Sequence, residues 1–233
     1  MIKKAMILSA GYGKRLNPLT LSKPKPLLKI GEETLLSNTV NLLLKLGIKE
    51  VVINVHYLAE QIIAYVEKKN FNLTINILNE KNKILDTGGG ILNAIKYFKN
   101  EPFLTINPDT IWNINHVKEI NNMQKGFELN KECKCKMLVV NRKKSFDKNF
   151  KGDFSLEKNL IKDNKNIKYV YTGLQLIKPE VFNGIRKKTF PINRIWKKLI
   201  KKNELHGSES HIKFLHISTL EVYKNLLNKN FKH

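Results

Sequence analysis

In the first half of the chain, short apolar runs alternate with longer segments in which apolar residues recur every three or four positions. Leu36, Val40 and Leu43 show this spacing, which is typical of a helix that buries one face. The short runs have the length and composition of strands. We therefore expect strands at residues 4–10, 50–55, 74–79 and 103–107, and helices at residues 34–46, 58–69 and 89–98.

Strands that alternate with helices in this way predict an α/β fold, a Rossmann-like three-layer αβα sandwich around a mostly parallel central sheet. In such sheets, ligands bind beyond the carboxyl ends of the strands. The loop at residues 11–15 follows the first strand, and Asp109 follows the fourth. We therefore expect this loop and this carboxylate to face one crevice.

The pattern is less regular after about residue 112. Helices are expected at residues 114–125, 181–185, 192–201 and 220–228, and strands at 134–140, 169–177 and 211–217. A lysine- and asparagine-rich stretch, 141–168, lies between them. Since no repeat or linker interrupts the chain, we expect a single domain over residues 1–233.

The composition limits the class of protein. With 233 residues, 42% of them hydrophobic, the chain can bury a sizeable core. No apolar run reaches the roughly 18 residues needed to span a bilayer, and the N-terminus lacks the layout of a signal peptide. Cys133 and Cys135 are expected to be free thiols, because no second pair completes a zinc site. We therefore expect a cytoplasmic protein without a membrane partner.

The net charge of +22 raises the question of a nucleic-acid partner. The lysines are spread along the whole chain, however, and no dense basic stretch carries interleaved aromatic residues. Lysine, asparagine and isoleucine are abundant together, which favours a bias at the coding level. A basic RNA-binding module is therefore the weakest of the candidate functions, and we expect no nucleic-acid partner.

The loop after the first strand carries the clearest chemical signal. It reads GYGKR at residues 11–15, and Lys25 follows in a Pro-Lys-Pro frame. Glycines let backbone N–H groups approach a phosphate chain, and Lys14, Arg15 and Lys25 supply positive charge. The loop is not a dinucleotide fingerprint, because Leu16 stands where the last glycine belongs, and it is not a Walker loop. It predicts a site for a nucleoside triphosphate.

Two stretches carry a resemblance to a known family. Residues 8–20 (LSAGYGKRLNPLT) with the Pro-Lys-Pro frame resemble the nucleotide-binding signature of the sugar-1-phosphate nucleotidyltransferases, with Ser9 in place of a more usual alanine. Residues 85–91 (LDTGGGI) are similar to that family's base-reading segment. Their TGGG form is most like the N-acetylmuramate-1-phosphate uridylyltransferase branch, with the mannose-1-phosphate guanylyltransferases close behind.

The resemblance runs from residue 3 to about residue 225 and implies the nucleotide-diphospho-sugar transferase fold. Residues 1–112 would then form a nucleotide-binding half and residues 113–233 a sugar-phosphate-binding half. In the implied reaction, an oxygen of a sugar 1-phosphate attacks the α-phosphorus of a nucleoside triphosphate, and pyrophosphate leaves. Arg15 would hold the β- and γ-phosphates, and Lys25 would stabilise charge on the α-phosphate or the attacking phosphate.

The expected catalytic residues are Arg15, Lys25 and Asp109. The residues expected to bind the nucleotide are Leu8, Ser9, Ala10, Gly11, Gly13, Lys14, Arg15, Thr87, Gly88 and Gly89. On the acceptor side, residues 152–154 (GDF), 171–175 (YTGLQ) and 190–196 (FPINRIW) look like segments of the same branch. They give Asp153, Thr172, Gly173 and Asn193 as the expected sugar-binding residues.

The metal site is where the chain departs from the family. Asp109 is the candidate ligand for a Mg²⁺ ion that bridges phosphates. The family pattern W-x-D-x-G-T-P-E corresponds here to residues 214–221, FLHISTLE, so His216 stands at the position of a second aspartate. Four roles stay open for His216: a ligand of a softer ion such as Mn²⁺, a phosphate contact, a bystander to Mg²⁺ held by Asp109, phosphates and water, or a structural residue.

We therefore expect an enzyme of nucleotide-sugar and cell-wall biosynthesis, a monomer or a small homo-oligomer. It would transfer a nucleotidyl group, from UTP in the first place, to N-acetylmuramate 1-phosphate or a related hexose 1-phosphate. A guanylyltransferase that uses GTP and mannose 1-phosphate is the alternative within this chemistry. From another class, the alternative is a nucleotide-sugar-binding subunit that has lost catalysis, with His216 as the trace of that loss.

Overall fold

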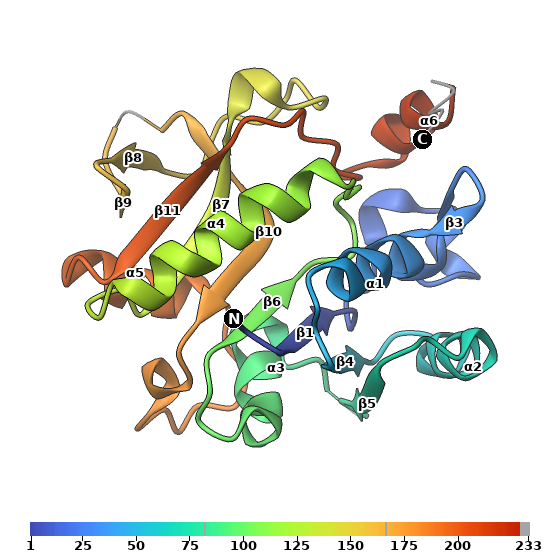
Figure 1. Ribbon diagram of the computed structural model, residues 1–233. Helices are drawn as coiled ribbons and strands as arrows, with labels where there is room; N and C mark the ends of the chain where they lie inside the picture. Colours follow the sequence, from blue (N-terminus) through green and yellow to red (C-terminus); the bar gives the residue numbers. More distant parts are fainter. Residues whose placement is uncertain (82, 166, 229–233) are drawn as a thin grey trace.

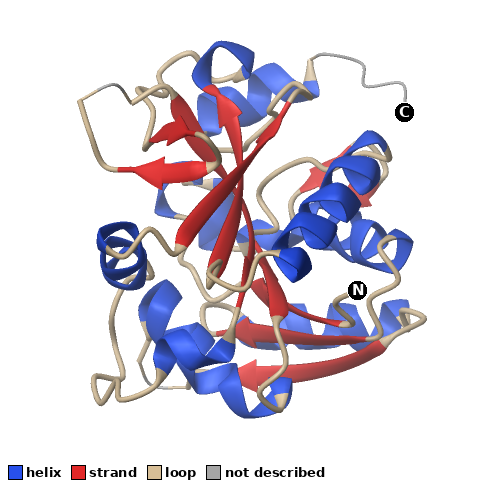
Figure 2. Ribbon diagram, turned by 60° about the vertical axis from the view of Figure 1, so that its left-hand side comes forward, coloured by secondary structure: helices blue, strands red, loops and turns tan. Residues whose placement is uncertain are grey.

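The computed structural model describes residues 1–81, 83–165 and 167–228, so residues 229–233 of the expected second half lie outside the described residues. Within this part of the chain, nine strands form one twisted sheet in the order β5-β4-β1-β6-β10-β7-β11-β9-β8 (Figure 1). A separate pair joins β2 (Lys29–Ile30) to β3 (Glu33–Thr34). Helices lie on both faces of the large sheet (Figure 2).

Parallel strands build the first half of the sheet. β1 (Lys4–Leu8) pairs in parallel with β4 (Glu50–Val55) and with β6 (Phe103–Ile106), and β4 pairs in parallel with β5 (Thr74–Asn79). These strands are almost entirely apolar in their buried centre, as a parallel sheet covered on both faces requires. Their carboxyl ends therefore meet at one edge of the sheet.

The second half adds one strand of opposite direction. β10 (Tyr169–Ile177) runs antiparallel to β6 and to β7 (Cys135–Asn141), and β11 (Leu205–Ser210) runs parallel to β7. The short strands β8 (Ser155–Glu157) and β9 (Leu160–Lys162) close this edge as a hairpin. Except for β10, the long strands point one way, so the expected mostly parallel sheet is confirmed.

Two apolar cores lie on opposite faces of this sheet. One contains residues of α1 (Leu35–Lys45), α2 (Ala59–Lys69) and α4 (Asn115–Leu129), and the other contains residues of α3 (Asp86–Ala94) and α5 (Asn193–Lys201). Thr34 caps α1, because its side chain accepts a hydrogen bond from the backbone N–H of Ser37. The expected three-layer αβα sandwich is confirmed.

A third, smaller core fastens the C-terminal helix to the glycine-containing loop. α6 (Leu220–Leu227) packs Tyr223 and Leu226 against Leu16 and Leu28. The Tyr223 hydroxyl donates to the carbonyl of Lys29 at 2.7 Å. The loop that follows β1 is therefore held from the far end of the chain.

Most element predictions agree with the structure, and three strands agree residue for residue: 50–55, 74–79 and 169–177. The strand predicted at 211–217 is wrong. The last strand is β11, and residues 211–217 form only isolated bridges such as Thr110–His216 within the described part of the chain. β11 reads LHGSES, a polar run with a central glycine, and pairing with β7 overrides its low strand propensity.

Other departures are smaller. The helix predicted at 181–185 is a 3-10 turn, Pro179–Phe182, and the helix predicted at 114–125 continues to Leu129. The helix predicted at 89–98 begins three residues earlier, at Asp86, and ends as a 3-10 turn, Ile95–Phe98. The lysine- and asparagine-rich stretch contains β8 and β9, which were not predicted.

The structure also bears on two expectations from composition. Cys133 and Cys135 are both free and buried, and burial raises the pKa of the Cys133 thiol to about 11. Among the described residues, none of the helices combines the length and the apolar character that a bilayer crossing requires.

Candidate active site

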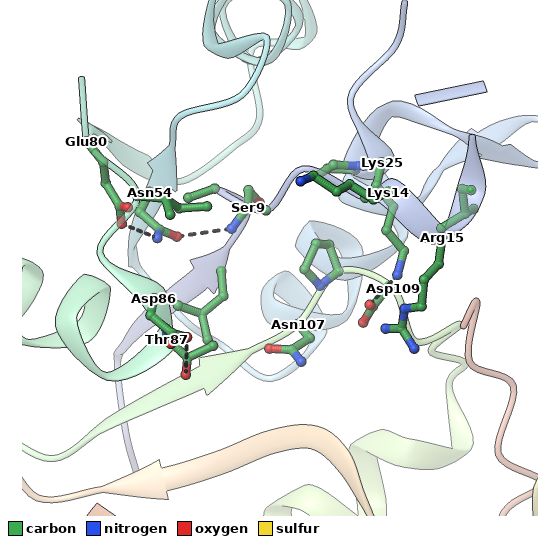
Figure 3. Close-up of a pocket in the computed structure, with 18 residues that line it drawn as sticks. Ser9, Lys14, Arg15, Lys25, Asn54, Glu80, Asp86, Thr87, Asn107 and Asp109 are labelled. Carbon is green, nitrogen blue, oxygen red and sulfur yellow. Dashed lines mark hydrogen bonds and ion pairs between the residues drawn. The ribbon is translucent and has the colours of Figure 1, made fainter. Parts of the chain in front are cut away.

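A cavity of about 360 Å³ opens at the carboxyl ends of the parallel strands (Figure 3). The loop after β1 lines one side, and residues 107–109, which follow β6, line another. The expectation that the cationic loop and Asp109 share one crevice is confirmed. The predicted site residues on this wall are Leu8, Ser9, Ala10, Gly11, Gly13, Lys14, Arg15, Lys25, Thr87 and Asp109.

Gly11 and Gly13 of the loop have different surroundings. Gly13 has φ +65°, and a Cβ there would lie 3.0 Å from Thr20 Cγ2 and 3.2 Å from Lys25 Cβ. A side chain at Gly13 would therefore push the Lys25 backbone away. At Gly11 a Cβ would meet nothing within 4 Å, so the backbone borders open space that a phosphate can approach.

Lys25 and Asp109 form an ion pair at the wall of the cavity. Lys25 Nζ lies 2.5 Å from Asp109 Oδ2, and the two side chains are 13% and 18% exposed. The neighbouring Lys23 and Lys29 are exposed to solvent. Of Lys23, Lys25 and Lys29, Lys25 alone lines the cavity.

The charge states of Asp109 and His216 follow from their surroundings. Burial alone would raise the pKa of Asp109, but His216, Lys25 and the hydrogen bond from Lys25 outweigh it and bring that pKa to about 2. Burial lowers the pKa of His216, assisted by the charges of Lys25 and Arg15 and opposed by Asp109. The cationic neighbours of Asp109 therefore hold its pKa well below the usual range, and burial holds the pKa of His216 below its own.

The structure brings His216 to the position expected from the sequence. Its Nδ1 lies 3.5 Å from Asp109 Oδ1 and 3.4 Å from Thr110 Oγ1. Its ring stacks on Phe214, with ring planes 13° apart. Asp109 Oδ1 is buried and has no hydrogen-bond partner, whereas Oδ2 is occupied by Lys25.

These atoms fit a divalent cation whose remaining coordination positions are filled by substrate phosphates and water. No group of three or more His, Cys, Asp or Glu side chains within the described residues could hold a metal ion alone. Mg²⁺ commonly takes one or two carboxylates and fills its remaining positions with substrate phosphates and water. The unpartnered oxygen of Asp109 meets that need without displacing Lys25 from the other oxygen.

One polar network in the cavity was not predicted. Asn54 Oδ1 accepts from the backbone N–H of Ser9 at 3.0 Å, and Asn54 Nδ2 donates to Glu80 Oε1 at 2.7 Å (Figure 3). Glu80 Oε2 accepts from the backbone N–H of Leu85 at 2.8 Å. The network ties the ends of β1, β4 and β5 to the start of α3. An asparagine within the apolar strand EVVINV was the signal for it.

Gly88 and Gly89, which are expected to bind the nucleotide, are not among the described residues that line this cavity. A Cβ at Gly88 would lie 2.4 Å from a ring carbon of Phe190, and one at Gly89 would lie 2.1 Å from the carbonyl oxygen of Lys188. The backbone N–H of Gly89 donates to the carbonyl of Phe190 at 3.0 Å. These glycines allow residues 188–190 to pack directly on α3.

A second cavity of about 590 Å³ adjoins the first, and Asn107 lines both. Two predicted sugar-binding residues, Asp153 and Asn193, lie on its wall together with His216. Asp153 Oδ2 accepts from the backbone N–H of Tyr171 at 2.9 Å, and burial raises the pKa of Asp153. Two cavities that meet at Asn107 can hold two ligands end to end.

Thr172 and Gly173, which are expected to bind the sugar, are not among the described residues that line this cavity. Thr172 is buried, and its hydroxyl donates to the carbonyl of Leu138 at 2.8 Å. Gly173 has φ +91°, and a Cβ there would lie 2.9 Å from Asn107 Cβ. Its carbonyl accepts from the backbone N–H of Asn107 at 2.8 Å, so Gly173 supports Asn107 instead.

Comparison with known proteins places this architecture in a defined group. The family model described as nucleotidyl transferase matches residues 4–147. The chain is 28% identical over 222 residues to N-acetylmuramate alpha-1-phosphate uridylyltransferase of Caulobacter vibrioides, covering 92% of this chain and 91% of the relative. It is 31% identical over 186 residues to the protein of that name from Neisseria meningitidis serogroup B, covering 78% of each.

Two further likenesses are more limited. The catalytic subunit beta of mannose-1-phosphate guanylyltransferase from Dictyostelium discoideum is 36% identical over 110 residues, which are 46% of this chain and 31% of that protein. The crystal structure of HddC from Yersinia pseudotuberculosis superposes with a TM-score of 0.76 at 21% identity, covering 98% of this chain and 99% of that one. At this identity the superposition shows the fold alone.

Proposed function

The chain belongs to the nucleotidyl transferase family, within its sugar-1-phosphate nucleotidyltransferases, and from this premise we propose that it transfers the uridylyl group of UTP to N-acetylmuramate 1-phosphate. The observation that carries the proposal is the pair of cavities that meet at Asn107. One has a cationic glycine-containing loop, and the other has polar side chains suited to a sugar. Uridylyltransferase is the name of the two relatives matched over most of the chain.

The proposed reaction exchanges one phosphate linkage for another. An oxygen of the sugar 1-phosphate bonds to the α-phosphorus of UTP, the bond from that phosphorus to the β-phosphate oxygen breaks, and pyrophosphate leaves. Arg15 offers a planar pair of N–H donors to the β- and γ-phosphates. Lys25 stands between the loop and Asp109, where the α-phosphate and the attacking phosphate would meet. Positioning and charge neutralisation then supply most of the catalysis.

A divalent cation, Mg²⁺ by preference, would be held by Asp109 Oδ1, the triphosphate and water, and when bound it supplies charge neutralisation at the phosphates. The pKa of Asp109 is held well below neutrality, so this oxygen is ionised and ready to ligate at any pH near neutrality. His216 Nδ1 faces the same oxygen and is the one candidate for a second protein ligand among the described residues near it. An imidazole there favours Mn²⁺ over Mg²⁺.

Replacing His216 by aspartate tests that role. If His216 is a ligand, His216→Asp strengthens the dependence on Mg²⁺ and weakens any preference for Mn²⁺, because a hard oxygen replaces a nitrogen. The measurement is the initial rate as a function of each ion's concentration. An unchanged metal profile would leave Asp109 as the protein's ligand and His216 as an aromatic neighbour of Phe214.

The charged residues on the wall of the second cavity offer a test of the proposed sugar. N-acetylmuramate carries a lactyl carboxylate in addition to its phosphate. Lys197, on the exposed side of α5, is the lysine among the described residues that line this cavity, and the arginines lie elsewhere. Asp153 and Asp163 line it too and can accept from hydroxyl and acetamido groups. A carboxylate-bearing sugar would meet Lys197.

Lys197→Gln should raise the KM for N-acetylmuramate 1-phosphate about two- to fivefold, which is the upper part of the range for one exposed ion pair. The KM for N-acetylglucosamine 1-phosphate, which lacks the lactyl group, should not change. Lys198→Gln is the matched control, because Lys198 is the next residue of α5, exposed, and not on the cavity wall. An equal rise for both sugars would exclude recognition of the carboxylate.

The base is tested by turnover with each nucleoside triphosphate in competition. We expect the highest kcat/KM with UTP. A preference for GTP together with mannose 1-phosphate would instead support the guanylyltransferase function. That function is the second candidate, because the guanylyltransferase relative is matched over only 110 residues.

The two cysteines of the chain are free, which accords with the reducing cytoplasm proposed as its location.

A further inference from the structure

The segment at residues 188–192 crosses over the start of α3 before it enters α5, and we name it the crossing segment. The backbone N–H of Phe190 donates to the carbonyl of Leu85 at 3.2 Å, and the carbonyl of Phe190 accepts from Gly89 at 3.0 Å. Thr87 Oγ1 accepts from the backbone N–H of Ile192 at 2.9 Å. Three hydrogen bonds therefore join the start of α3 to the residues directly before α5.

The two ends of this connection lie on different cavities. Asp86 and Thr87 line the cavity assigned to the nucleotide. Asn193 and Lys197 of α5 line the cavity assigned to the sugar, and Ile192 directly precedes Asn193. The absence of side chains at Gly88 and Gly89 lets the crossing segment lie close enough for these bonds.

The Thr87 hydroxyl is already engaged by the protein. It accepts from Ile192 and lies 3.4 Å from Asp86 Oδ1, to which it can donate weakly. The backbone N–H of Thr87 donates to the same Asp86 oxygen at 2.6 Å. These bonds leave the hydroxyl oriented toward α5 rather than free to recognise a base.

We propose that Thr87 is a positioning residue that couples the two cavities. Its hydroxyl accepts a hydrogen bond from the N–H of Ile192 and so fixes the first turn of α5 when a nucleotide lies against α3. Asn193 and Lys197 are positioned together with that turn. This inference rests on the proposed function. The TGGG stretch then serves to align the sugar phosphate, and the bound nucleotide stabilises the aligned state. Binding of nucleotide and of sugar phosphate is then mutually favourable.

Thr87→Val removes the acceptor while keeping the shape of the side chain, and Thr87→Ser keeps the hydroxyl. Thr87→Val should raise the KM for the sugar 1-phosphate about tenfold, as expected for one lost hydrogen bond, and change the Kd of UTP less than about twofold. Thr87→Ser should behave like the wild type. A rise in the Kd of UTP with an unchanged KM for the sugar would overturn the proposal and place Thr87 on the base.

Hydrogen exchange separates this inference from the proposed function, because it needs no turnover. Addition of UTP should slow amide exchange at residues 190–197 in the wild type and in Thr87→Ser, and should not do so in Thr87→Val. Thermal melting checks that each variant is folded. UTP-induced protection that survives in Thr87→Val would overturn the coupling, even in a protein that turns over every substrate. Loss of protection only in Thr87→Val would support it, even if no sugar phosphate is turned over.

Discussion

Lys25→Met lowers kcat about a thousandfold and leaves the Kd of UTP within a few fold, because the lost ammonium acts on charge that develops at the α-phosphorus. At about 4 Å and an effective dielectric near 20, one such charge pair is worth about 4 kcal/mol before desolvation. Methionine keeps most of the length of the lysine side chain and removes its charge. The measurement is steady-state pyrophosphate release, with calorimetry for UTP.

The loop supplies its own controls. Lys23→Met and Lys29→Met remove charges close to Lys25 in the sequence, at exposed positions that do not line the cavity. Both should retain nearly full activity. If Lys25→Met kept a tenth or more of the wild-type rate, or if the three variants lost activity equally, Lys25 would be no more than the partner of Asp109.

Asp109→Asn is the second change with a large expected effect. It removes the charged oxygen proposed for the cation, so kcat should fall about a hundredfold or more and the metal concentration for half-maximal rate should rise. The variant also leaves Lys25 without its partner in a largely buried position. The double variant Lys25→Met/Asp109→Asn relieves this, so it should regain thermal stability and remain inactive. Recovery of activity along with stability would contradict a catalytic role for both Lys25 and Asp109.

Asp109 has a second signature in the dependence of stability on pH. Its pKa of about 2 in the folded protein lies below its ordinary value of 3.8, so the carboxylate contributes about 2 kcal/mol of stability above pH 4. That contribution is lost as the pH falls from about 4 toward 2. The unfolding free energy of the wild type should fall more steeply over this interval than that of Asp109→Asn.

The parallel half of the fold could be predicted from sequence because its signals are local. β4 and β5 are short apolar runs between polar turns, and helical spacing marks α1. β11 could not be predicted this way. It is a strand because β7 pairs with it along six residues, Leu205–Ser210.

The site shows the same division between local and distant signals. The loop at residues 11–15 and Asp109 each follow a strand, so their meeting was predictable from the topology alone. Lys25 and Asp109 are 84 positions apart in the sequence, so a short motif cannot predict their ion pair. The glycines at 88 and 89 were expected beside a base because residues 85–91 resemble the family's base-reading segment. In the structure the approaching group is the backbone of residues 188–190.

The proposed function requires that the two cavities hold a nucleotide and a sugar phosphate for one transfer reaction. The decisive experiment incubates the protein with UTP, N-acetylmuramate 1-phosphate and Mg²⁺, and measures pyrophosphate and the UDP-linked sugar together. We expect equal amounts of both products, formed only with a divalent cation and lost in Lys25→Met. Tight binding of UTP without pyrophosphate release from any sugar 1-phosphate would refute the transfer reaction and would favour a nucleotide-sugar-binding subunit that has lost catalysis.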